Sequence, residues 1–220
     1  NVHGIIVLNV YNERLLRLLA ETQIPKVFLD TSSLVAPDEL NGDLLLMESR
    51  TSVRRITSHL LEQGRTLPGF IGDIGYAQSN RERYEGFCQA LTDAGKKVDS
   101  SLCLTTPLGI DTYREEIDTF LSSLSRMPDA FVCASDYVAC ILMQLLEKRG
   151  LRVPEDVAVS GFDNNTEDLL AEHLTTVQVF NEELGARLAL QILYRIKYPN
   201  TPHEVTYLGT NVLYRDSTGD

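Results

Sequence analysis

Short apolar runs alternate along this chain with longer segments in which apolar residues recur every three or four positions. The short runs are typical of buried β-strands, and the longer periodicity is typical of amphipathic helices. We therefore expect strands near residues 4–10, 26–30, 43–47, 69–73, 102–104, 129–135 and 157–160, and an extended segment at 204–215. Helices are expected near residues 11–21, 50–63, 79–93, 111–124, 137–149 and 181–197.

The regular alternation of strands and helices predicts an α/β fold with one or two mostly parallel sheets. In open sheets of this kind, ligands bind beyond the carboxyl ends of the strands. That rule selects the residues that follow each expected strand, namely residues 73–80, Ser135 with Asp136, and residues 161–165. A binding site assembled from these three segments is the expectation from periodicity alone.

The composition is that of a folded, acidic protein. The 220 residues are 43% hydrophobic and 23% charged, which excludes a disordered chain. The net charge of -11 repels phosphate backbones, so we do not expect this chain alone to bind nucleic acid strongly. The sequence contains neither the apolar run that a membrane span needs nor a recognisable signal peptide. Because it begins with Asn1 rather than methionine, we expect it to be a fragment.

The sequence lacks the motifs of several enzyme and metal-site classes. Four cysteines without a C-x-x-C pair and four scattered histidines exclude a zinc site by spacing. We expect the cysteines to be free, buried thiols in a reducing cytosol. No P-loop or G-x-S-x-G motif is present, and GDIGYA at residues 72–77 lacks the glycine spacing of a dinucleotide site. We therefore expect no catalytic residue, no metal and no cofactor.

Several motifs in a consistent order carry a resemblance to a known family. The motifs are VPEDVAVSGFDN at 153–164, LTTV at 174–177, LGARLALQIL at 184–193, RERYEGFCQAL at 81–91, DAFVCASD at 129–136 and YRDST at 214–218. Together with the strands VHGIIV and IPKVFLD, they make the chain similar to the effector-binding part of LacI/GalR transcriptional regulators. The match extends from about residue 2 to residue 218.

The resemblance implies a periplasmic-binding-protein-like type I fold, in which two Rossmann-like parallel-sheet subdomains are joined by three crossovers. The N-terminal subdomain would hold residues 1–66 and 180–200, and the C-terminal subdomain residues 67–179 and 201–220. The crossovers are expected near residues 64–69, 177–180 and 201–204. Compared with the family, this chain lacks the helix-turn-helix headpiece and the first strands and helices of the first subdomain, so we expect that subdomain to be incomplete.

Arg83 and Asp163 are the first two candidate ligand-binding residues that the resemblance implies. Arg83 stands at the arginine of the family's R-x-x-G-F motif, and a guanidinium offers forked donors to hydroxyls or carboxylates. Asp163 stands at the aspartate of the G-[YF]-D motif, where a carboxylate can accept hydrogen bonds from sugar hydroxyls. The alternatives are a surface arginine on a charged helix and an aspartate that caps the next helix.

Four further candidates complete the expected site. Ser135 and Asp136 match a pair that is usually Asn-Asp in the family, and Ser135 departs from it because a hydroxyl lacks the bidentate pairing of an amide. Asp136 is equally compatible with a role as a helix cap. Tyr76 can stack on a ligand ring or be an exposed loop residue. Tyr113 lies where the family often places a pocket aromatic.

The function that the resemblance implies is effector sensing. A small molecule, a sugar or sugar phosphate, would bind the cleft of a cytoplasmic homodimer and change how absent headpieces meet operator DNA. No membrane partner is expected. The alternatives are a periplasmic sugar-binding protein of a transporter and, from another class, a doubly wound α/β enzyme. A helix-turn-helix upstream, a signal peptide upstream, or turnover of a bound sugar would distinguish the three.

Overall fold

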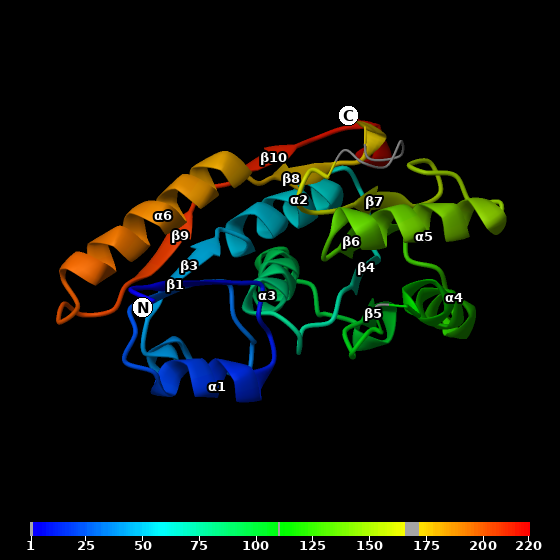
Figure 1. Ribbon diagram of the computed structural model, residues 1–220. Helices are drawn as coiled ribbons and strands as arrows, with labels where there is room; N and C mark the ends of the chain where they lie inside the picture. Colours follow the sequence, from blue (N-terminus) through cyan, green and yellow to red (C-terminus); the bar gives the residue numbers. More distant parts are fainter. Residues whose placement is uncertain (1, 110, 166–171) are drawn as a thin grey trace.

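The apolar runs of the sequence form two separate parallel sheets, one in each of two lobes (Figure 1). The computed structural model describes residues 2–109, 111–165 and 172–220. The first sheet has the strand order β1-β2-β3-β9 and the second has the order β5-β4-β6-β7. The strands of the first are β1 (Ile5–Leu8), β2 (Lys26–Leu29), β3 (Asp43–Met47) and β9 (Val205–Leu208). Those of the second are β4 (Pro68–Ile71), β5 (Cys103–Leu104), β6 (Ala130–Cys133) and β7 (Ala158–Ser160).

Helices connect the strands of each sheet, as the alternating pattern predicts. They are α1 (Glu13–Glu21), α2 (Arg50–Glu62), α3 (Gln78–Asp93), α4 (Tyr113–Ser123), α5 (Asp136–Lys148) and α6 (Asn181–Lys197). Among the described residues, short 3-10 helices lie at η1 (Pro37–Leu40), η2 (Ser100–Leu102) and η4 (Asp216–Thr218). The expected α/β class and the periplasmic-binding-protein-like arrangement are confirmed.

A short antiparallel pair joins the two lobes. Strand β8 (Thr176–Gln178) pairs with β10 (Asn211–Leu213), and both lead directly into or out of the first lobe. The chain passes between the sheets at residues 63–67, between α2 and β4, at residues 179–180, between β8 and α6, and at residues 209–210, between β9 and β10.

The position of the third crossing differs from the expected one at residues 201–204. Strand β9 pairs with β3 in parallel register, with Leu44 opposite Val205, so residues up to 208 belong to the first sheet. The Asp43 carboxylate anchors this segment, because it accepts the Glu204 backbone N–H at 2.9 Å. A tertiary contact therefore holds in the first lobe a segment that the sequence division assigned to the second.

One hydrophobic core runs through both lobes. It joins Val27 and Leu45 of the first sheet to Phe70 and Val132 of the second through residues of α2 and α3. Helices α2 and α3 pack closely, and Gly86 makes this possible, because a Cβ there would come within 2.2 Å of the Arg50 carbonyl oxygen. The glycine of the R-x-x-G-F motif is therefore explained by helix packing.

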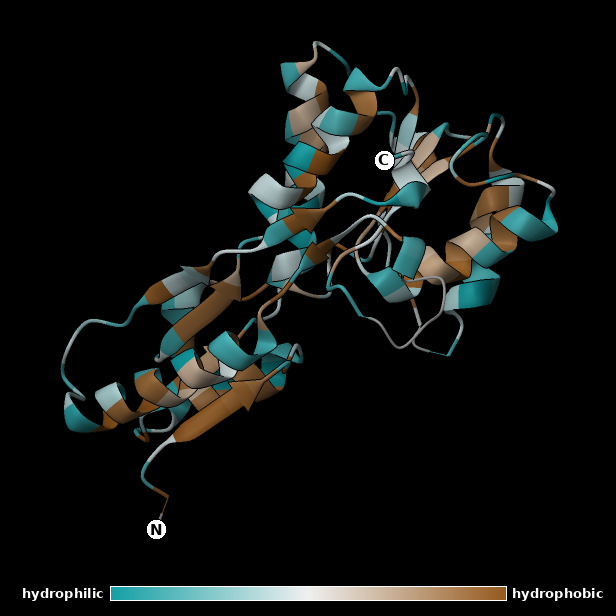
Figure 2. Cartoon of the chain, turned by 90° about the horizontal axis from the view of Figure 1, so that it is seen from above, coloured by the Kyte–Doolittle hydropathy of each residue, from teal (hydrophilic) through white to brown (hydrophobic). Residues whose placement is uncertain are grey.

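The edge of the first sheet is more open than its centre. Strand β1 pairs only on one side among the described residues, and Ile6 and Leu8 are 40% and 54% exposed. By contrast, β2, β4 and β6 are buried throughout, as expected for strands covered on both faces. Figure 2 shows the strands of the first sheet as strongly apolar, beside helices that carry both hydrophobic and hydrophilic stretches.

Candidate functional site

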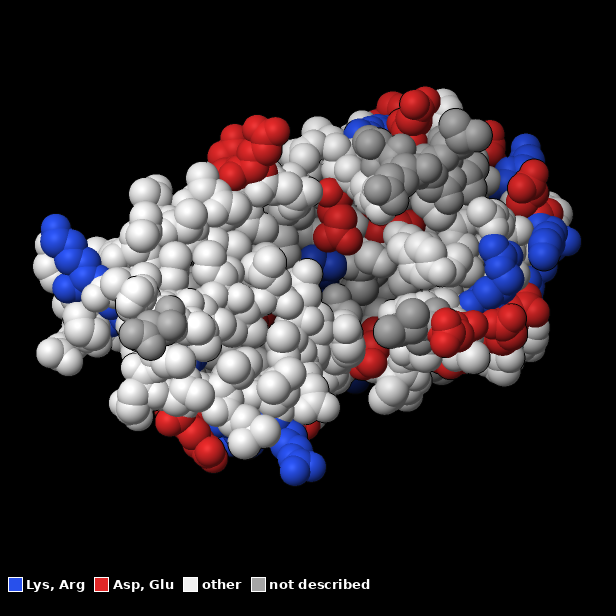
Figure 3. Space-filling model, viewed as in Figure 1, with Lys and Arg blue, Asp and Glu red and all other residues white. Residues whose placement is uncertain are grey.

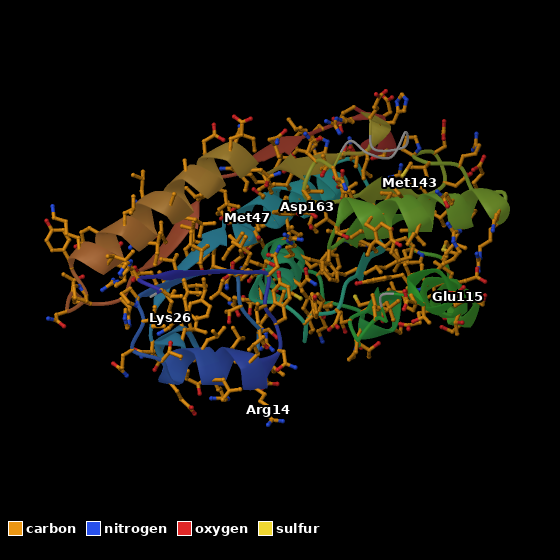
Figure 4. The ribbon with its side chains drawn as sticks, in the orientation of Figure 1. Arg14, Lys26, Met47, Glu115, Met143 and Asp163 are labelled. Atoms are coloured by element: carbon orange, nitrogen blue, oxygen red, sulfur yellow. The ribbon has the colours of Figure 1, made fainter. Side chains whose placement is uncertain are left out.

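A cavity of about 400 Å³ lies between the two lobes, beyond the carboxyl ends of strands from both sheets. Figure 3 shows a hollow at this junction, where basic and acidic side chains meet. Figure 4 shows Met47 and Asp163 near the junction, Met47 from the first lobe and Asp163 from the second. The polar lining residues are Asn9, Tyr11, Asp30, Asp73, Tyr76, Ser79, Asn80, Arg83, Tyr113, Ser135, Asp163 and Asn181. The volume suits a small molecule, and the lining is polar.

Arg83 projects from the second turn of α3 and is the best-buried cation of the cavity, with only 4% of its surface exposed. One terminal nitrogen donates to the Ala134 carbonyl oxygen, and the other lies 3.5 Å from Asp163 Oδ1. The guanidinium carbon lies 3.7 Å from the centre of the Phe162 ring. The buried Nε has no hydrogen-bond partner among the described residues. This arginine therefore has donor capacity that the protein itself leaves unused.

Asp163 follows β7 and faces Arg83 across the cavity. Its backbone N–H donates to the Val177 carbonyl oxygen at 3.0 Å, while its side chain stays 43% exposed. Burial removes water from the Asp163 carboxyl and raises its pKa, and the positive charge of Arg83 opposes that rise. The carboxylate is thus free to accept hydrogen bonds from a ligand. The segment that Asp163 was alternatively expected to cap includes residues 166–171, which lie outside the described residues.

Ser135 and Asp136 are adjacent in sequence but differ in position. Ser135 lines the cavity and caps α5, because its hydroxyl accepts the Val138 N–H at 3.3 Å. Asp136 does not line the cavity and is 2% exposed. Its carboxylate accepts the Thr176 hydroxyl at 2.6 Å and the Asn165 N–H at 2.7 Å. The structure therefore brings five of the six expected residues together and places Asp136 behind them.

Tyrosines border the cavity on two sides. Tyr76 is 47% exposed and packs against Tyr11 of the first lobe, with 4.4 Å between the ring centres. Tyr113 packs edge-on against Tyr137, with 5.7 Å between the centres, and burial raises the pKa of its hydroxyl. Both Tyr76 and Tyr113 line the cavity, so each offers a face or edge to a bound ring.

The sequence analysis missed the wall that the first lobe contributes. Asn9 and Asp30 directly follow β1 and β2, and both adopt positive φ angles of 52° and 59° where the chain turns away. Asp30 accepts the Ser79 hydroxyl at 2.6 Å, and Tyr11 donates to the same Asp30 oxygen at 3.3 Å. The rule that ligands bind at carboxyl strand ends selects these positions too, but the candidate residues taken from the family motifs all lie in the second lobe.

The cavity lining offers both hydrogen-bond acceptors and hydrogen-bond donors. Carboxylates of Asp30, Asp73 and Asp163 offer acceptors, Arg83 offers donors, and Tyr76 offers an aromatic surface. Among the described residues, no group of His, Cys, Asp and Glu is placed to hold a metal ion. A ligand with several hydroxyl or ring-nitrogen groups fits this mixture of acceptors and donors.

Comparison with known proteins gives a consistent result. Residues 57–218 match the family described as periplasmic binding protein-like domain. The PurR repressor of Glaesserella parasuis is 27% identical over 90% of this chain, and the regulator DegA of Bacillus subtilis is 31% identical over 76% of it. This chain spans 58% and 48% of those two proteins.

The structural comparison agrees with the sequence relatives. A complex of the transcriptional regulator CelR with cellobiose has a TM-score of 0.86 and 27% identity, and the match covers 99% of this chain and 66% of that one. These relatives are transcriptional regulators and not enzymes. Within the described residues, none of the helices has the length and apolar character needed to cross a membrane.

Proposed function

The chain belongs to the family of periplasmic binding protein-like domains, in the form that LacI/GalR regulators use for effector binding. From this premise, we propose that its inter-lobe cavity binds a sugar or sugar phosphate. The observation that carries the proposal is the Arg83–Asp163 pair, which places a buried guanidinium and a half-exposed carboxylate at one cavity. A hydroxylated ligand can accept from the first and donate to the second.

The proposed ligand acts by linking the lobes. Asn9, Tyr11 and Asp30 come from the first lobe, whereas Arg83, Ser135 and Asp163 come from the second. A ligand that touches both walls favours one relative arrangement of the lobes over another, which is the requirement for allosteric coupling. In the whole cytoplasmic regulator, this arrangement would be passed through a homodimer to DNA-binding headpieces outside this chain.

The proposal is tested by thermal denaturation in the presence of single compounds. Cellobiose, ribose, glucose 6-phosphate and hypoxanthine are each added over a range of concentrations, so that two sugars, a sugar phosphate and a purine are compared. Cellobiose is included because one similar structure is a cellobiose complex. A specific ligand at 100 times its dissociation constant should stabilise the protein by about 2.7 kcal/mol. If hypoxanthine is the compound that stabilises the protein, the ligand proposed for this site becomes a purine instead of a sugar.

Variants locate the binding site. Arg83→Ala and Asp163→Ala should each abolish the ligand-induced shift while the protein remains folded. Arg17→Ala is the matched control, because Arg17 forms an exposed ion pair with Glu39 on the first lobe, away from the cavity. If both cavity variants respond like the parent protein, the ligand binds elsewhere. Turnover of the added sugar would show that the protein is an enzyme rather than a sensor.

A further inference from the structure

The turn that carries Asp163 into the cavity has an unusual backbone. Asp163 and Asn164 are consecutive non-glycine residues with φ angles of 110° and 52°. Side chains disfavour this left-handed region, so such a turn persists only where neighbouring groups hold it. The position of the Asp163 carboxylate therefore depends on the contacts that fix residues 163–165.

One set of these contacts comes from β8. The Asp163 N–H donates to the Val177 carbonyl oxygen at 3.0 Å, and the Asn164 N–H donates to Thr176 Oγ1 at 3.2 Å. The Asn164 side-chain amide reaches Gln178 Oε1 at 2.5 Å. Because β8 leads directly into the crossing at residues 179–180, the turn is attached to the segment that joins the lobes.

A second set comes from the buried Asp136. Its two carboxylate oxygens accept hydrogen bonds from different elements. One oxygen accepts from the Asn165 N–H of the turn at 2.7 Å, and the other accepts from the Thr176 hydroxyl of β8 at 2.6 Å. Its backbone N–H donates to the Phe162 carbonyl oxygen at 2.8 Å, just before the turn. A Cβ at position 161 would come within 2.2 Å of Asp136 Oδ1, which accounts for Gly161 in the G-F-D motif.

A third set comes from the C-terminal segment. Arg215 donates to Asn164 Oδ1 at 2.8 Å and to the Leu174 carbonyl oxygen at 3.1 Å. Together, Asp136, Thr176 and Arg215 hold the turn from three elements, which are the start of α5, β8 and the segment after β10. We define these three residues as the clamp.

We propose that Asp136 is a positioning residue that acts through this clamp: it binds no ligand itself, and it fixes the turn at residues 163–165 so that the Asp163 carboxylate faces Arg83. This assignment refines the proposed effector site, and its ligand-binding consequence rests on the proposed function. The geometric part does not, because it concerns the protein without ligand. The contacts of Asp136 with the turn and with β8 also explain why this aspartate lies outside the cavity although it follows a strand end.

Amide hydrogen exchange, followed residue by residue by NMR on the ligand-free protein, tests the geometry. Asp136→Ala should accelerate exchange at the Asn165 amide at least tenfold, because that N–H loses its carboxylate acceptor. Thr176→Val should do the same at the Asn164 amide with little change in side-chain shape. Thr176→Ser keeps the hydroxyl and should exchange like the parent protein.

The pattern of exchange decides between positioning and general stability. Acceleration confined to residues 163–165, with amides of β6 and the middle of α5 changed less than twofold, supports the proposal. Equal acceleration throughout the second lobe, or no change at residues 163–165, overturns it. If Asp136→Ala does not fold, the Thr176→Val and Thr176→Ser pair still gives a result.

Ligand affinity provides the second measurement. For whichever of cellobiose, ribose, glucose 6-phosphate or hypoxanthine stabilises the parent protein, Thr176→Val should weaken binding at least fivefold and Thr176→Ser should restore it. Unchanged affinity in Thr176→Val, together with a mobile turn, would show that the turn does not position a ligand group. If none of the four compounds binds the parent, the proposed function fails while the exchange experiment still tests the clamp.

Discussion

Two arginine–aspartate pairs in this protein have the same chemistry and opposite surroundings. In the first lobe, Arg195 and Asp43 are each 2% exposed and are joined by two hydrogen bonds, of 2.5 and 3.0 Å. Between the lobes, Arg83 is buried but Asp163 is 43% exposed, and the two are 3.5 Å apart. The first pair is closed, whereas the second is open to the cavity.

The partners of each arginine explain the difference. Arg195 donates in addition to the carbonyl oxygens of Thr201 and Pro202, at 2.6 and 2.9 Å. Asp43 also accepts from Gln191 at 2.8 Å and from the Glu204 N–H. These contacts leave few hydrogen-bond donors or acceptors of the Arg195–Asp43 pair available to another molecule.

Arg83, in contrast, has a buried Nε without a partner among the described residues. A buried donor that the fold leaves unsatisfied is costly unless something else uses it, and this one is in a residue that lines a cavity. The two pairs therefore differ in how completely the protein itself occupies them: Arg195–Asp43 is enclosed by further partners, whereas Arg83–Asp163 keeps a half-exposed carboxylate at the cavity.

The largest expected effect concerns the closed pair. Burial alone would raise the pKa of Asp43, but hydrogen bonds from Arg195 and Gln191 outweigh it and lower that pKa. Asp43→Ala leaves a buried guanidinium without its partner, so the free energy of unfolding should fall by about 3–5 kcal/mol in urea denaturation. The exposed pair supplies the control, since solvent screens the Arg17–Glu39 contact and Arg17→Ala should cost far less than Asp43→Ala. A loss for Asp43→Ala no greater than the control would remove the distinction between the pairs.

An intermediate effect concerns Asp136, a buried carboxylate whose hydrogen-bond donors above are neutral. Burial raises its pKa to about 6, helped by the Asp163 charge and opposed by the Thr176 and Asn165 hydrogen bonds and the Arg215 charge. Because this pKa lies above the unfolded value of about 3.9, folding takes up a proton between about pH 4 and pH 6. Stability should therefore rise as the pH falls through 6.

The measurement compares urea denaturation of the parent protein and Asp136→Asn at pH 7 and pH 4.5. The parent should gain about 2 kcal/mol relative to the variant on acidification, since the variant carries no titrating group at this position. Taking this difference between proteins cancels the titration of the other carboxylates. Equal changes in the two proteins would mean that Asp136 titrates like an exposed aspartate.

The smallest expected effect concerns the aromatic contact beside the open pair. Tyr76 of the second lobe packs on Tyr11 of the first, so Tyr76→Ala should lower the free energy of unfolding by about 0.5–1.5 kcal/mol. Tyr76→Phe keeps the ring and should retain most of that contribution. Loss of ligand-induced stabilisation in Tyr76→Ala but not in Tyr76→Phe would identify the ring as the ligand contact, and loss in both variants would assign that role to the hydroxyl.

Much of this architecture was predictable from the spacing of apolar residues. The run at 129–135, for example, contains the buried strand β6, because a strand covered on both faces needs apolar side chains at every position. Arg83, Asp163 and Ser135 were also predictable, since each lies in a motif that the family resemblance identified. The crossing at residues 209–210 was not, because the pairing of β9 with β3 joins segments about 160 residues apart.

The sequence by itself determined the α/β fold, the effector-binding family and the cavity wall that the second lobe contributes. These features depend on local periodicity and on motifs of a few consecutive residues. Only the tertiary structure placed Asn9, Tyr11 and Asp30 opposite that wall and moved Asp136 behind it. The physical reason is that burial and hydrogen bonding depend on neighbours from distant segments. Asp136 and Asp163 both follow strands, yet Thr176 and Asn165 occupy the carboxylate of the first, whereas that of the second stays open to the cavity.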